Sequence, residues 1–218
     1  MRVLFVILRI IAGGGIIAAI VGQLAFSLDY GVPNVPHFLV NFFSFFTILS
    51  NAMAAIVLLA GAWFGLRPAS TPSWYTLVRG SVTTYMVTTG VVYNLLLRGI
   101  SLDQATTLPW SNEVLHLFAP IYLLLDWLLA PGRERIAWQR FATILAFPAA
   151  WLVYTLIRGP IVGWYPYPFL NPAQPGGYGA VLIYCVAIAG FIGVMGVGVV
   201  AVSRTRQLLV PSSSPALP

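Results

Sequence analysis

A threonine and a histidine in two apolar stretches of this chain have the chemistry of a nucleophile and a base. Thr47 lies in the stretch 38–66, and His116 lies near the start of the stretch 114–130. A threonine hydroxyl is a weak nucleophile until a neighbouring base takes its proton, and a neutral imidazole can be that base. If the two stretches are neighbouring helices, they can bring the hydroxyl and the imidazole together. Acyl transfer is the chemistry that such a pair indicates.

Five further polar side chains are candidates for contacting a substrate or stabilising an oxyanion. They are Asn51, Asn94, Arg98, Asn112 and Glu113. Donors of this kind stabilise negative charge when they are held in place beside the reacting atom. Asn112 lies one helical turn before His116 and Glu113 three residues before it, so either can also orient the imidazole. The spacing does not rank the five.

Two other roles for His116 stay open. It could be a structural hydrogen-bonding residue in a helix bundle, or it could share a haem with His37, the other histidine. The pair Glu113-x-x-His116 offers at most two metal ligands, and the lone Cys185 supplies no cluster. We therefore expect neither a metal nor a cofactor.

The composition differs sharply from that of a water-soluble protein. Of 218 residues, 59% are hydrophobic and 7% are charged, and all 11 basic residues are arginine. Ordinary soluble domains are about 25% charged. So few charges cannot cover a soluble globule, which excludes a soluble enzyme, a disordered chain and a nucleic-acid-binding module. The expected partners are membrane lipids or a lipid-ester substrate, and not nucleic acid.

Six apolar stretches reach the ~17–25 residues that a transmembrane helix needs. They are 3–28, 38–66, 77–97, 114–130, 141–157 and 178–202. They are too long for barrel strands and do not alternate, which favours helices. We expect an all-α integral membrane protein with one six-helix transmembrane domain over residues 1–203. The Ser/Pro-rich tail at 204–218 is predicted to be disordered.

The distribution of arginine predicts how the helices are oriented. Nine arginines fall in the N-terminal segment and in alternate segments after it, whereas only Arg98 and Arg158 fall in the segments between. Arginine is enriched in cytoplasmic loops. Both termini are therefore expected in the cytoplasm, with the chain crossing the cell membrane several times.

An aromatic and proline-rich segment precedes the last apolar stretch. Proline has a fixed φ and no amide hydrogen, so this segment does not continue a helix. Tryptophan and tyrosine favour the membrane interface. A rigid lid on the outer surface fits both facts, and a simple interfacial anchor fits them equally well. The lid residues would be Trp164, Tyr167, Pro168 and Phe169.

Three short motifs together resemble those of one family of membrane proteins. They are Phe45-Phe46-Thr47-Ile48, then Asn112-Glu113-Val114-Leu115-His116 with Pro120 after it, and the segment 164–172 with Tyr167-Pro168-Phe169-Leu170. On these motifs, and on the order and spacing of its apolar stretches, the chain resembles the androgen-induced, FAR-17a-type family. The bacterial members of that family are short six-span proteins.

The resemblance implies an activity. Members of the family are threonine hydrolases that cleave fatty acid esters of hydroxy fatty acids, and their catalytic threonine and histidine fall on Thr47 and His116. Pro166 is an additional proline here, and Arg158-Gly159 replaces a histidine-containing stretch of the animal members, so the animal substrate does not transfer with the fold. Two alternatives remain: a non-catalytic protein that binds or transports a lipid or apolar small molecule, and a haem or quinone electron carrier.

Overall fold

A computed structural model describes residues 2–67, 71–100 and 107–205, and the described chain contains helices and connections but no strand. The helical elements are α1 (Arg2–Asp29), α2 (Val35–Phe42), α3 (Phe46–Leu66), α4 (Ser73–Val92), η1 (Tyr93–Leu97), α5 (Pro109–Glu113), η2 (Val114–Phe118), α6 (Ala119–Leu129), η3 (Trp138–Arg140), α7 (Phe141–Val162), η4 (Pro168–Leu170) and α8 (Gly177–Ser203). The elements η1 and η2 are π-helical. The all-α expectation is therefore met.

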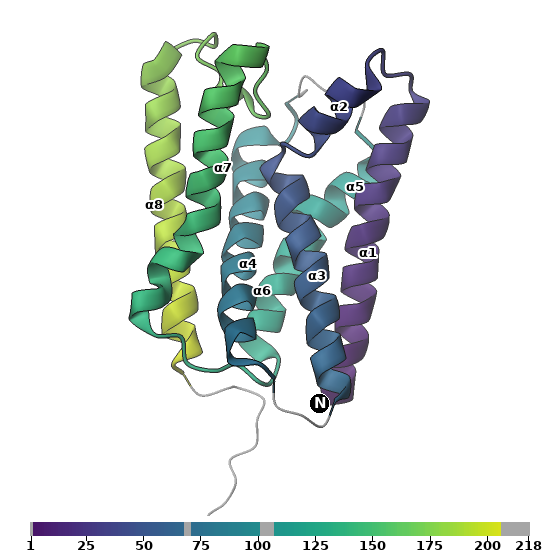
Figure 1. The fold of residues 1–218 in the computed structure, drawn as a ribbon, viewed down its shortest axis with the longest axis vertical. Coiled ribbons are helices and arrows are strands. Elements are labelled where there is room, and N and C mark those ends of the chain that lie inside the picture. The colour runs from purple at the N-terminus through teal and green to yellow at the C-terminus, as the bar shows by residue number, and fades with distance from the viewer. Residues whose placement is uncertain (1, 68–70, 101–106, 206–218) are drawn as a thin grey trace, which may run out of the picture.

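In the part of the chain that the structure describes, five helical segments are long and apolar enough to cross a membrane. They are Arg2–Asp29, Phe46–Leu66, Pro109–Leu129, Trp138–Val162 and Gly177–Ser203. The long helices run side by side, and α1 begins at the end of the bundle where α8 finishes (Figure 1). The segments predicted at 3–28 and 178–202 agree closely with α1 and α8. The predicted tail lies outside the described residues from 206 onward.

Helix α4 lies in the middle of the bundle, where it contacts α3, α6, α7 and α8 (Figure 1). Together with η1 it covers the predicted stretch 77–97, but it is not among the five apolar segments. The reason is its row of buried hydroxyl groups. Thr83, Thr84 and Thr88 each donate a hydrogen bond to the carbonyl one turn earlier, so they need no partner from another helix.

The predicted stretch 38–66 is not one helix. It breaks at Phe43–Phe45 into the short α2 and the long α3. Side chains of α7 hold the break open: the Trp151 indole donates to the Ser44 carbonyl at 2.9 Å, and the Tyr154 and Ser44 hydroxyls lie 2.8 Å apart. Helix α3 therefore starts at Phe46, and Thr47 lies in its first turn rather than inside a continuous helix.

Two arginines that the sequence placed among the cytoplasmic charges are buried inside the bundle. Arg9 and Arg79 are 6% and 1% exposed and both contact the Asp126 carboxylate, at 2.8 and 2.9 Å. A charge buried in an apolar bundle needs a partner of opposite sign. This cluster joins α1, α4 and α6. It lies toward the end of the bundle where α1 begins, and the Ser44 break lies toward the other end (Figure 1).

Candidate active site

Thr47 and His116 come together as a hydrogen-bonded pair. Thr47 Oγ1 lies 3.2 Å from His116 Nε2, and His116 Nδ1 lies 3.0 Å from the backbone carbonyl of Asn112. A carbonyl only accepts, so Nδ1 carries the proton of the neutral imidazole. Nε2 is then an acceptor, and the Thr47 hydroxyl donates to it. This is the arrangement of a nucleophile with its base, the base oriented by a third group.

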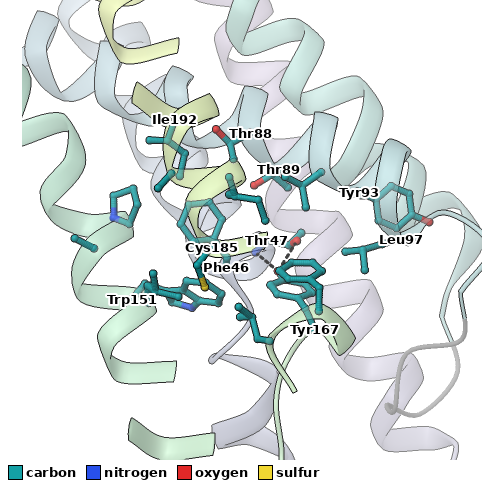
Figure 2. A pocket seen from close by; sticks show the side chains of 18 of the residues that line it. Phe46, Thr47, Thr88, Thr89, Tyr93, Leu97, Trp151, Tyr167, Cys185 and Ile192 are labelled. Atoms are coloured by element: carbon teal, nitrogen blue, oxygen red, sulfur yellow. Dashed lines mark hydrogen bonds between the residues drawn. The ribbon is translucent and has the colours of Figure 1, made fainter. Parts of the chain in front are cut away.

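A third hydroxyl, from Tyr167, completes the network. Tyr167 Oη accepts the backbone N–H of Thr47 at 3.1 Å and lies 3.2 Å from Thr47 Oγ1. Because the Thr47 proton points to His116, the Tyr167 hydroxyl is the donor in its contact with Oγ1. Figure 2 shows the Tyr167 ring reaching across to the start of α3. The chain of proton donors therefore runs from Tyr167 through Thr47 to His116.

Tyr167 finds this position because the start of α3 offers free amides. The first N–H groups of a helix have no partner within it. Phe45, the residue before α3, makes no side-chain capping bond, so Tyr167 caps the helix from 120 residues away. Phe45 and Trp151 pack against the Tyr167 ring at centroid distances of 5.6 and 5.9 Å and fix its direction.

The π-helical turn η2 carries His116 and leaves two of its carbonyls without a helical donor. Pro120 has no N–H to give to the His116 carbonyl, and the Ala119 amide bonds to Val114 instead of to Leu115. A π turn inside an α-helix is frequently found at a functional site. Here it sets the rotation at which His116 faces Thr47.

Two of the five predicted contact residues donate hydrogen bonds to these two carbonyls. Asn94 Nδ2 donates to the His116 carbonyl at 3.1 Å, and Asn51 Nδ2 donates to the Leu115 carbonyl at 3.1 Å. Neither side chain lines a cavity at the site. Asn51 and Asn94 therefore support the backbone that carries His116.

The other three predicted contact residues are Arg98, Glu113 and Asn112. Arg98 forms a two-armed ion pair with Glu113, at 2.9 and 3.0 Å, and its Nε donates to Asn94 Oδ1 at 2.8 Å. The hydrogen bonds that Arg98 donates to the Glu113 carboxylate raise the pKa of Arg98. Asn112 donates to the Tyr93 hydroxyl, and the Tyr93 ring stacks on His116 at 3.8 Å between centroids. Asn112 contacts His116 directly through its backbone carbonyl. Arg98 and Glu113 are linked to His116 through the Asn94 side chain.

A large apolar cavity opens beside Thr47. Its volume is about 260 Å³, and its walls come from α4, α7, α8 and the segment around η4. Figure 2 shows Thr47 on one wall, with Cys185 and Ile192 of α8 on another. Hydrophobic side chains make up most of the lining, so the cavity suits an apolar group.

Thr47 also lines a second, smaller cavity. Its volume is about 70 Å³, and Gln23, Asn112 and His116 contribute polar groups to it. Four residues line both cavities. They are Thr47, Tyr93, Leu97 and Tyr167.

The predicted lid residues do not act as one unit. Tyr167 and Phe169 turn inward and line the large cavity, with their rings stacked 5.3 Å apart. Trp164 packs edge-on against Phe45 at 5.4 Å, and Pro168 begins the short turn η4. Two of the four predicted lid residues, Tyr167 and Phe169, therefore supply part of the lining of the candidate site.

The predicted haem pair does not form a shared pocket in the described residues. His37 is exposed in helix α2, and its Nε2 contacts the Asn41 amide at 3.1 Å. Both ring nitrogens of His116 are already hydrogen bonded. Within the described part of the chain, no three His, Cys, Asp or Glu side chains gather as metal ligands.

Sequence reasoning missed two features of the site. It did not identify Tyr93, which stacks on His116, and it treated Tyr167 as part of a lid rather than as a partner of Thr47. Pairings between residues so far apart in the chain leave no periodic signal. Comparison of the chain with family models, with curated proteins and with solved structures finds no match.

Proposed function

We propose that this protein is an intramembrane hydrolase of lipid esters, with Thr47 as the nucleophile and His116 as the base. The observation that carries the proposal is the 3.2 Å contact between Thr47 Oγ1 and His116 Nε2 beside a large apolar cavity. The resemblance to threonine hydrolases of the androgen-induced family supports the same assignment. The substrate class is an ester of a fatty acid.

The geometry supports a two-step acyl transfer. His116 Nε2 takes the Thr47 proton while Oγ1 attacks the ester carbonyl, and the oxyanion that forms needs donors close to Oγ1. The Tyr167 hydroxyl donates toward Oγ1 and has its own lone pair engaged by the Thr47 amide. Tyr167 is therefore the proposed oxyanion donor, in place of Asn51, Asn94 or Arg98.

We also propose a six-span topology in the cell membrane, with both termini in the cytoplasm. The continuous helical run from Ser73 to Leu97 is long enough to be the sixth span, buried in the middle of the others. Pairing of Arg9 and Arg79 with Asp126 removes two charges from the cytoplasmic set, but the arginine bias keeps its sign. Thr47 then lies toward the outer leaflet, because α3 begins at the end of the bundle away from the termini (Figure 1).

Labelling by a fluorophosphonate probe tests the proposal directly. The purified protein in detergent should react with the probe and hydrolyse p-nitrophenyl esters of fatty acids, and Thr47→Ala should lose both activities. Thr84→Ala is the matched control, because it removes a buried threonine hydroxyl that bonds only within α4 and lines neither cavity. Unchanged labelling and ester turnover in both Thr47→Ala and His116→Ala would show that the assignment is wrong.

Binding of an apolar ligand without chemistry is the second candidate, and the apolar lining of the large cavity favours it. In that case Thr47→Ala would bind a fluorescent fatty acid as the unmodified protein does, and neither would turn over an ester. The haem alternative has no such support, since both nitrogens of His116 are engaged.

A further inference from the structure

Thr47 lines two cavities that differ in size and chemistry. The one lined by α7 and α8 holds about 260 Å³ and is mostly apolar, whereas the one lined by Gln23, Asn112 and His116 holds about 70 Å³. Tyr167 is part of the lining of both cavities. A bound ester has two parts, and each must lie on one side of Thr47 Oγ1.

The position of His116 decides which part lies where. In ester cleavage Oγ1 forms a bond to the carbonyl carbon, the bond from that carbon to the alcohol oxygen breaks, and the proton taken by His116 passes to the departing oxygen. Of these two cavities of the described chain, the small one is lined by His116 and the large one is not. The alcohol oxygen must therefore leave on that side, while the acyl group stays bonded to Oγ1 and extends into the large cavity.

From this division, which rests on the proposed function, we infer that the protein selects esters of a long acyl chain with a compact alcohol. The acyl chain occupies the apolar cavity beside Ala149 and Ala189, and the alcohol occupies the cavity beside His116. A fatty acid ester of a hydroxy fatty acid, whose alcohol part carries a second long chain, fits less well than a glycerol or methyl ester.

The small cavity also explains how the acyl-enzyme is resolved. Its volume of about 70 Å³ exceeds the ~10–15 Å³ that one water molecule needs, so water enters once the alcohol has left. His116 then takes a proton from that water, the water oxygen bonds to the acyl carbon, and the proton returns to Thr47 Oγ1 as the fatty acid departs. The same imidazole therefore serves both steps from one side.

Variants that fill each cavity separately test the inference. Ala189→Leu narrows the large cavity from α8, and Ala149→Leu narrows it from α7. Each is assayed on p-nitrophenyl esters from acetate to palmitate, and on one acyl group esterified to methanol, glycerol or hexadecanol. Displacing about two substrate methylenes should lower kcat/KM for palmitate relative to acetate by roughly tenfold, and leave the ranking of the alcohols unchanged. Ile100→Trp narrows the small cavity. It should change the ranking of the alcohols and leave the ratio of kcat/KM for palmitate and acetate unchanged.

Fluorophosphonate labelling of Thr47 shows that each variant keeps a folded site. If one of the two leucine variants is unstable, the other is sufficient for the test. A labelled Ala189→Leu or Ala149→Leu that changes the alcohol ranking, or that slows all acyl chains equally, would overturn the division. So would a protein that cleaves the hexadecanol ester as fast as the methyl ester. An unmodified protein that neither labels nor hydrolyses any ester would instead refute the proposed function, and the division with it.

Discussion

Replacing Tyr167 by phenylalanine removes one hydroxyl from the centre of the candidate site. The ring keeps its contacts with Phe45, Trp151 and Phe169, so the packing of the segment changes little. Two hydrogen bonds are lost: the one accepted from the Thr47 amide and the one donated to Thr47 Oγ1. The first hydrogen bond supports the start of α3. In the proposed mechanism the Tyr167 hydroxyl donates to the oxyanion instead of to Thr47 Oγ1 once the oxyanion forms.

The two losses have separate magnitudes. A buried amide left without a partner costs about 1–3 kcal/mol, which Tyr167→Phe should show as a lower free energy of unfolding. Loss of one oxyanion donor typically lowers kcat by about 100-fold or more. We therefore expect ester turnover per folded molecule to fall at least tenfold, with KM little changed, because the hydroxyl acts mainly in the transition state.

Tyr85→Phe is the control that separates stability from chemistry. The Tyr85 hydroxyl donates to the Ile144 carbonyl at 2.8 Å, a carbonyl left free because Pro148 has no N–H. Its removal should cost a similar free energy of unfolding yet leave turnover unchanged, since Tyr85 lines neither cavity. Thermal unfolding in detergent and active-site titration with the fluorophosphonate give both quantities. If Tyr167→Phe turned over esters at the rate of Tyr85→Phe per labelled molecule, the oxyanion assignment would be refuted.

Three further substitutions have clear expected outcomes. Asp126→Asn should prevent stable folding or cost about 3–5 kcal/mol by thermal unfolding, because it leaves Arg9 and Arg79 buried without a counter-charge. Gly90→Ala should slow labelling of Thr47, since the added Cβ would come within 2.9 Å of Pro120 and push η2 away. Asn94→Leu should slow labelling too, by leaving the His116 carbonyl without a donor, and normal labelling rates would contradict either statement.

Much of the fold was predictable because length and hydropathy decide it. Apolar stretches of sufficient length form helices in lipid whatever their neighbours are, so α1 and α8 were placed to within a residue or two. The break before α3 was not predictable in this way. It depends on Trp151 and Tyr154, more than a hundred residues away, which capture Ser44.

The candidate pair was predictable from residue type, whereas the roles of its neighbours were not. A hydroxyl and an imidazole in apolar surroundings stand out in a sequence with few polar groups. The asparagines also stand out, but an amide that touches a substrate and an amide that supports a carbonyl look the same in a sequence. Pro120 and the π turn leave two backbone carbonyls without a helical donor. Only the structure shows that Asn51 and Asn94 donate to these carbonyls.

Substitution of Pro120 therefore tests whether the π turn η2 places His116 beside Thr47. A π turn and a proline inside one helical run are both unfavourable by local rules, and such violations collect at functional sites. In Pro120→Ala the new amide can bond to the His116 carbonyl, compete with Asn94 and let η2 return to a regular α-helix. That change would rotate His116 away from Thr47 Oγ1. We expect labelling to fall at least tenfold while the free energy of unfolding stays the same or rises, because alanine is favoured over proline inside a helix by ~3 kcal/mol. A variant that is more stable and fully active would show that the irregular turn has no part in placing the imidazole.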